Sequence, residues 1–184
     1  MSTSMVHCGV NNACAVVEAQ GRHRYFKISS AEVANAVETL AVLAETRTGQ
    51  ARALPNARGV PNELRFARTC YDHLAGELAV GLVDGMIKQE WLRNDESRFE
   101  VTRLGSRALS DLGVDLEHAQ RSRRLFAPHC QDWSQRRPHV GGGLGAALLD
   151  CYLRQGWMEP GRTSRLVRVT PKGQAVLDRV LAAH

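Results

Sequence analysis

Two segments of the chain share one pattern of hydrophobic and polar positions. The first runs from His73 to Leu92 and the second from His139 to Met158, and they align without a gap. Self-similarity of this kind indicates a repeated supersecondary unit. The identical positions are His73/His139, Gly76/Gly142, Leu78/Leu144, Leu82/Leu148, Asp84/Asp150, Gln89/Gln155 and Trp91/Trp157.

Each segment predicts a helix, a short hairpin and a closing helix. In the first, Leu78 and Leu82 recur at helical spacing, and a short strand begins at Trp91. After a polar turn, the alternation around Phe99 predicts a returning strand, and Thr102 is suited to cap a closing helix. Helix, two-stranded wing and helix form the second half of a winged helix-turn-helix. The second segment repeats these features in order at Leu144, Leu148, Trp157, Val167, Val169 and Thr170.

A third, incomplete copy of this unit lies near the N-terminus. Residues 13–28 read as strand, turn and strand, and predict a wing hairpin. Ser29 and Glu32 then form a capping box at the start of a helix predicted over residues 30–46. The predicted fold class is therefore α+β, mainly α, built from tandem winged-helix units with short two-stranded antiparallel wings.

Composition divides the chain into three parts. Proline, glycine and asparagine gather in the segment TGQARALPNARGVPN, which is typical of a linker. Asn62 begins a predicted helix that continues through Cys70 to Gly76 and leads into the first full unit. We therefore expect a partial winged-helix domain at 1–47, a linker at 48–61, and a C-terminal region at 62–184 whose two units span about 62–120 and 121–184.

The overall composition indicates a soluble globular protein. The chain has 184 residues, of which 43% are hydrophobic and 23% are charged. It contains no apolar run long enough for a membrane span and no signal-peptide pattern. Its five cysteines lack CxxC spacing, which indicates neither a disulfide framework nor a zinc ribbon. We expect a reduced, cytoplasmic protein that does not contact membranes.

The positive charge of the chain is concentrated in one window. The formal net charge is +5, and most of the cationic residues are arginines. Between residues 121 and 137 the arginines outnumber the single acidic residue, Asp132, and give that window a net charge of +4. Such a stripe suits a surface that faces phosphates, although a solvated face between domains would carry the same charge. The arginines of the stripe are Arg121, Arg123, Arg124, Arg136 and Arg137.

Three segments together carry a resemblance to a known family. They are the predicted wing from Gln20 to Ile28, the segment from Ala67 to Gly76, and the segment from Cys130 to His139. The wing and its following helix resemble those of arsenic-repressor-type (ArsR/SmtB) winged-helix regulators, and the other two resemble an extended C-terminal region found in some members. This resemblance implies a DNA-binding transcriptional regulator that acts as a homodimer, with helix 30–46 in the dimer contact. It also implies that the wing contacts phosphates through Arg22, His23, Arg24 and Lys27.

The chain departs from the family ahead of the wing. Members place a recognition helix there, preceded by a positioning helix. The residues before Ala13 contain no amphipathic helix pair. We therefore expect this chain to lack the recognition helix, together with the paired cysteines that metal-sensing members carry on it. The implied DNA contact is one with phosphates that does not read the base sequence.

Cysteine and histidine residues ahead of the two repeats suggest a metal site. Cys70 and His73 are three residues apart on a predicted helix, and Cys130 precedes the second repeat. These three residues would suit a soft metal or an arsenical. The alternative is that they are buried cysteines and hydrogen-bonded histidines without a ligand. No other cofactor is indicated.

The sequence gives little support for an enzyme. The segment from Gly141 to Ala146 fits a GxGxxA dinucleotide pattern, but no hydrophobic strand precedes it, so close helix packing is the better reason for these glycines. Phosphate-loop, nucleophile-elbow and HExxH motifs are also missing from the sequence. Two alternatives to a regulator stay open. One is an interaction or stress-tolerance protein that does not bind DNA, and the other is a thiol- or metal-responsive sensor module that acts through Cys70 and Cys130.

Overall fold

The computed structural model describes residues 3–7, 13–20, 23–28, 33, 61–161 and 165–181. The chain divides into two compact units, residues 1–41 and 42–184, which are described separately below. Within the described ranges, no helix is both long enough and apolar enough to cross a bilayer.

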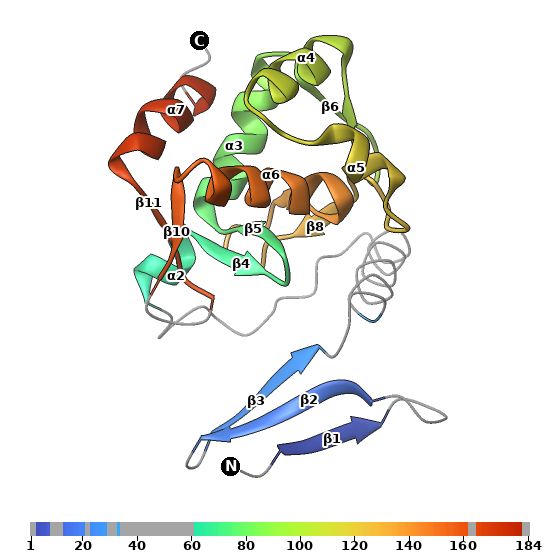
Figure 1. The fold of residues 1–184 in the computed structure, drawn as a ribbon, viewed down its shortest axis with the longest axis vertical. Helices are drawn as coiled ribbons and strands as arrows, with labels where there is room; N and C mark the ends of the chain where they lie inside the picture. The colour runs from blue at the N-terminus through green and yellow to red at the C-terminus, as the bar shows by residue number, and fades with distance from the viewer. Residues whose placement is uncertain are drawn as a thin grey trace. The chain divides into compact units, whose positions relative to one another are not determined.

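The N-terminal unit contains a three-stranded antiparallel sheet. Its strands are β1 (Thr3–His7), β2 (Ala13–Gln20) and β3 (His23–Ile28), with β2 in the centre (Figure 1). The register pairs Gln20 with His23 and Ala15 with Ile28, so the predicted wing hairpin is present as β2 and β3. β1 was not predicted. Of the predicted helix 30–46, only Val33 belongs to the described residues, and it is helical.

The C-terminal unit contains the same order of elements twice, each time as hairpin, helix, hairpin and helix (Figure 1). The first set is β4 (Arg68–Cys70), β5 (His73–Ala75), α3 (Glu77–Lys88), β6 (Leu92–Asn94), β7 (Phe99–Val101) and α4 (Arg103–Asp111). The second set is β8 (His129–Gln131), β9 (Pro138–Val140), α6 (Gly142–Arg154), β10 (Met158–Pro160), β11 (Val167–Val169) and α7 (Pro171–Leu181). The short helix α2 (Asn62–Phe66) precedes the first set, and α5 (Leu116–Arg121) lies between the two. The fold of this unit is mixed α+β.

The prediction of a helix from Asn62 to Gly76 is wrong beyond its first five residues. α2 ends at Phe66, and Ala67 has extended backbone angles. The residues that follow form the hairpin β4–β5, and the hairpin β8–β9 occupies the same place before α6. Cross-strand pairing and contacts with the other half override the helical preference of the segment, so Cys70 and His73 lie on a hairpin.

The predicted threonine caps are confirmed. The Oγ1 atom of Thr102 accepts a hydrogen bond from Gly105 N at 2.9 Å, and the Oγ1 atom of Thr170 accepts one from Gly173 N at 3.0 Å. The two glycines are required at these positions, since a Cβ atom on Gly105 or Gly173 would collide with the carbonyl of Trp91 or Trp157. Each closing helix therefore packs directly against the backbone of the preceding tryptophan.

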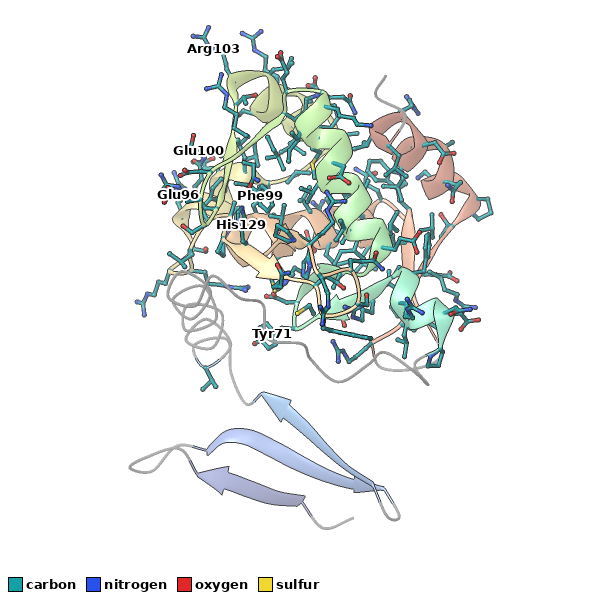
Figure 2. All side chains as sticks on the ribbon, turned by 180° about the vertical axis from the view of Figure 1, so that it is seen from behind. Tyr71, Glu96, Phe99, Glu100, Arg103 and His129 are labelled. Atoms are coloured by element: carbon teal, nitrogen blue, oxygen red, sulfur yellow. The ribbon has the colours of Figure 1, made fainter. Side chains whose placement is uncertain are left out.

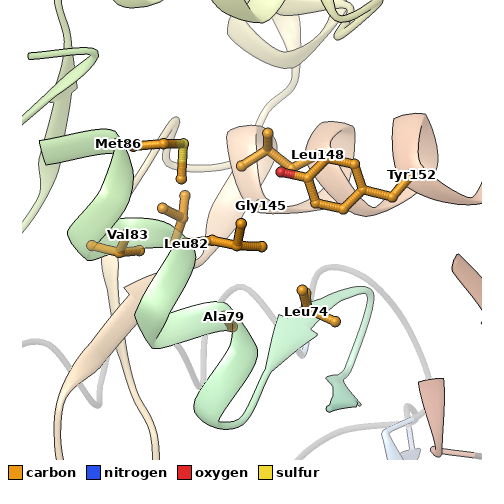
Figure 3. A pocket seen from close by; sticks show the side chains of 9 residues that line it. Leu74, Ala79, Leu82, Val83, Met86, Gly145, Leu148 and Tyr152 are labelled. Carbon is orange, nitrogen blue, oxygen red and sulfur yellow. The ribbon is translucent and has the colours of Figure 1, made fainter. Parts of the chain in front are cut away.

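The core lies between the two sets of elements. α3 contacts β9 of the second set, α6 contacts β5 of the first set, and β5 contacts β9. Close helix packing, the predicted reason for the glycines of α6, is confirmed at Gly143, where a Cβ atom would collide with the carbonyl of Ala119 on α5. At Gly145 the close neighbour is instead the carbonyl of Val140 on β9. Between the helices remains an apolar space of about 20 Å³, bordered by Leu82, Met86 and Leu148, which is room for about one water molecule (Figure 3).

Candidate metal centre

Two hairpins each place a cysteine opposite a histidine. Cys70 pairs with His73 across β4 and β5, and Cys130 pairs with His139 across β8 and β9. Because β5 and β9 are in contact, the two cross-strand pairs face each other. One donor atom from each of the four side chains lies within 4.8 Å of the others, and the two sulfur atoms are 3.8 Å apart.

The four side chains differ in their exposure to solvent. His73 is 0% exposed and His139 is 1% exposed, whereas both cysteines are partly exposed. The centroids of the two imidazole rings are 5.2 Å apart and the rings are tilted by 38°. The histidines therefore form the interior side of the cluster, and the sulfur atoms form the side that solvent reaches.

A carboxylate lies beside the Nδ1 atom of each histidine. Asp72 Oδ1 is 3.5 Å from Nδ1 of His73, and Asp132 Oδ2 is 3.6 Å from Nδ1 of His139. Asp72 lies in the turn of β4–β5, next to Tyr71, whose φ of 59° is unusual for a residue other than glycine (Figure 2). The turn that separates Cys70 from His73 thus also supplies the acid that flanks the histidine.

Asp132 is held by several donors from both sets of elements. Its carboxylate accepts hydrogen bonds from Gly76 N at 2.7 Å, Ser134 Oγ at 2.7 Å and Arg68 Nη2 at 2.8 Å. Burial raises the pKa of Asp132, but the hydrogen bonds from Ser134, Gly76, Gln135 and Arg68 outweigh it and lower the pKa to about 2. Asp132 is therefore an anion that ties β4 and the start of α3 to the loop between β8 and β9.

The second acid, Asp72, pairs with an arginine. Arg124 donates to the Oδ2 atom of Asp72, and this arginine side chain is 13% exposed. Burial raises the pKa of Asp72, while the hydrogen bonds with His73 and Arg124 lower it, and the net shift is downward. Both histidines consequently lie next to ionised carboxylates.

The hairpin β8–β9 is also fixed from its other side. His129 packs on Phe99 of β7 with ring centroids 4.4 Å apart (Figure 2), and Phe99 N donates to the carbonyl of Ala127 at 2.8 Å. Because the hairpin contacts both β7 and β5, its position is restrained from two sides. This restraint favours a preorganised cluster of the two cysteines and two histidines.

The thiols are suited to act as soft ligands. The hydrogen bond with Cys130 lowers the pKa of Cys70 against the opposing effect of burial, and the neighbouring His139 and His73 lower it further. Thiolate sulfur and imidazole nitrogen together are the donor set of structural zinc sites. The arrangement therefore has the chemistry of a Cys2His2 metal centre.

The structure brings together the predicted residues Cys70, His73 and Cys130, and adds His139. This fourth donor was not predicted from the sequence, although His139 is identical to His73 in the repeat alignment. That identity was the signal, since a donor in one repeat implies a donor at the same place in the other. No feature of the sequence indicated that Asp72 and Asp132 lie beside these histidines.

The predicted arginine stripe is largely engaged in ion pairs. Arg121 pairs with Glu117, Arg124 with Asp72, and Arg137 with Asp84. Arg123 and Arg136 are exposed and have no ion pair within the part of the chain that the structure describes. Among the predicted wing residues, His23, Arg24 and Lys27 lie on β3, and Arg22 lies outside the described residues.

Comparison with known proteins identifies the family. No protein-family model and no solved structure matches the chain. A curated relative does match: an uncharacterized HTH-type transcriptional regulator, YdfF, of Bacillus subtilis (strain 168). The two are 36% identical over 165 residues, which cover 90% of this chain and 72% of the relative. The chain therefore belongs to the family of helix-turn-helix (HTH) transcriptional regulators.

Proposed function

We propose that this protein is an ArsR-like regulator that binds DNA as a homodimer in the cytoplasm. The observation that carries the proposal is the 36% identity to a helix-turn-helix regulator along 72% of that regulator's length. A regulator is also consistent with the prediction that the chain is not an enzyme. We interpret the two element sets of the C-terminal unit as winged-helix-like units on the same grounds.

The wing hairpin is the proposed DNA contact. Its basic residues, Arg22, His23, Arg24 and Lys27, would meet phosphates, which position a protein on DNA without reading the bases. The hairpin belongs to a sheet in which β2 pairs on both edges, and this pairing gives the wing a rigid base.

The arginine stripe contributes less to this contact than its charge suggests. Arg124 and Arg137 are each committed to a carboxylate on another element, and each would lose that partner by turning to a phosphate. Arg123 and Arg136 are the members of the stripe that we assign to an auxiliary phosphate contact.

The test is fluorescence anisotropy with labelled DNA from the region upstream of the gene, over a range of salt concentrations. We expect the binding constant to fall as the salt concentration rises. The slope of its logarithm against the logarithm of the salt concentration should decrease in magnitude by about one for each phosphate contact that Arg22→Ala, Arg24→Ala or Lys27→Ala removes. Arg98→Ala is the matched control, because this exposed arginine lies in the β6–β7 turn beside Asp95 and Glu100.

Absence of binding at low salt would contradict the proposal and favour an interaction protein that does not bind DNA. Light scattering on the purified protein tests the homodimer, and a monomeric mass would remove that part of the proposal.

A second candidate function is a thiol- or metal-responsive sensor. The observation that favours it is the cluster of Cys70, His73, Cys130 and His139, which lies in the C-terminal unit and apart from the wing in the sequence. The two candidates are compatible, since one chain can carry both a part that binds DNA and a part that senses a metal or a thiol reagent.

A further inference from the structure

We propose that Cys70, His73, Cys130 and His139 bind one zinc-class divalent ion in tetrahedral geometry. The ion would be the ligand of the metal-responsive sensor proposed above, and the site rests on that second candidate function. It is independent of the DNA-binding proposal, because all four residues belong to the C-terminal unit. The four donors come from two hairpins that occupy equivalent places in the two sets of elements.

The distances fit such an ion. A tetrahedral zinc site with Zn–S bonds of about 2.3 Å separates two sulfur ligands by about 3.8 Å. The Sγ atoms of Cys70 and Cys130 are 3.8 Å apart. The donor atoms of all four residues lie within 4.8 Å of one another, so small side-chain rotations complete the coordination.

The carboxylates indicate which histidine nitrogens bind the ion. Histidine ligands usually direct one ring nitrogen to the metal and donate the other N–H group to a carboxylate or carbonyl. Here Asp72 and Asp132 lie beside the Nδ1 atoms of His73 and His139, which leaves the Nε2 atoms for the ion. Both ring nitrogens of His139 are buried and have no hydrogen-bond partner among the described residues. Nδ1 lies 3.6 Å from the carboxylate of Asp132, so Nε2 is the nitrogen that remains for an ion. The two aspartates are thus positioning residues.

The donor set selects the class of ion. Two thiolates balance the charge of a divalent cation, and soft sulfur with imidazole disfavours magnesium and calcium, which prefer oxygen ligands. Trivalent arsenic prefers three thiolates, whereas two sulfur atoms, those of Cys70 and Cys130, gather here among the side chains that the structure describes. Cys151, the other cysteine with a described side chain, donates instead to the carbonyl of Leu112 at 3.3 Å.

The ion would have a route from solvent and a definite mechanical role. It would enter on the side of the partly exposed sulfur atoms and come to rest against the buried histidines. It would then join β4–β5 to β8–β9, and so hold together elements that lie 60 residues apart in the sequence.

Cobalt(II) titration of the reduced, full-length protein tests the proposal. We expect one Co²⁺ per chain, with the intense visible bands of tetrahedral cobalt, a thiolate-to-cobalt charge-transfer band, and complete displacement by Zn²⁺. Cys70→Ser, Cys130→Ser and His139→Gln should each weaken binding by more than about 100-fold, since even loss of an outer carboxylate partner costs about 10–100-fold. Cys151→Ser is the matched control and should leave the spectrum unchanged.

His139→Cys guards against variants that fail to fold. This replacement keeps four donors, so we expect it to retain one cobalt per chain with a stronger charge-transfer band. Absence of the charge-transfer band in protein whose thiols are shown to be reduced would overturn the proposal. A band unaffected by His139→Gln, or stoichiometric binding of arsenite but not of Zn²⁺, would overturn it equally.

Discussion

The guanidinium of Arg68 donates to the carboxylate of Asp132 at 2.8 Å, and the two side chains are only 2% and 0% exposed. The pair joins β4 to the loop that follows β8. The Cζ atom of Arg68 also lies 4.2 Å from the ring centroid of Trp133. A buried ion pair of this kind is costly to break from one side, because the remaining charge has no solvent to stabilise it.

Asp132→Asn should therefore destabilise the C-terminal unit by about 3–5 kcal/mol. Urea denaturation in the presence of a chelator measures this change without a contribution from metal. The comparison is Glu100→Gln, which removes one partner of an exposed pair with Arg98 and should leave the unfolding free energy nearly unchanged. Equal effects of the two substitutions would show that burial of the Arg68 pair has no energetic consequence.

Gly105→Ala and Gly173→Ala should each destabilise the protein by about 1–3 kcal/mol. Alanine is the better helix former by about 1 kcal/mol, but its Cβ atom would meet the carbonyl of Trp91 or Trp157, and the backbone there has little room to shift. The clash should outweigh the propensity. Gly81→Ala, where the nearest atom is the end of the flexible Leu181 side chain at 3.3 Å, is the control, and thermal denaturation should show a clearly smaller effect.

Zinc binding at the proposed centre should stabilise the protein. An ion present at 100 times its dissociation constant adds about 2.7 kcal/mol to the unfolding free energy. The melting temperature should rise with Zn²⁺, fall on chelation, and stay unchanged with Mg²⁺. A wild-type response retained by the Cys70→Ser variant would assign the stabilisation to another site.

The protein should lose stability in alkaline solution. Burial raises the pKa of the Cys151 thiol above its ordinary value of 9.0, and burial also raises the pKa of Tyr152. As the pH rises above about 9, the unfolded chain releases these protons more readily than the folded chain does, so the unfolding free energy falls. Urea midpoints between pH 7 and 10 should show this decline. Cys151→Ala and Tyr152→Phe should each flatten it, and an unchanged decline in both would exclude these groups as its cause.

The sequence predicted the parts of the fold that local patterns determine. α3 and α6 follow from the helical spacing of leucines, and the hairpins after them follow from the tryptophan, the polar turn and the alternation. The caps at Thr102 and Thr170 follow from side-chain chemistry alone. The hairpins β4–β5 and β8–β9 could not be found this way, because a three-residue strand is too short to show alternation.

The candidate site was predicted in part for a related reason. Cys70, His73 and Cys130 stand out by residue type, but their approach depends on the contact of β5 with β9, which no local pattern encodes. The ion pairs of the arginine stripe depend on the same tertiary contacts. Arg137 reaches Asp84 on α3, for example, and the charge of the window alone gives no sign of this partner.

Each half of the C-terminal unit contributes one cysteine and one histidine to the cluster, and a single pair of donors would hold an ion only weakly. Because both pairs lie on one chain, an ion held by the first pair meets the second pair in an intramolecular step. The effective concentration of the second pair is therefore high. The affinity of the proposed centre would then depend partly on the connection between the two hairpins, which runs through α5. Lengthening or cutting that connection would loosen the ion without altering any of the four ligands.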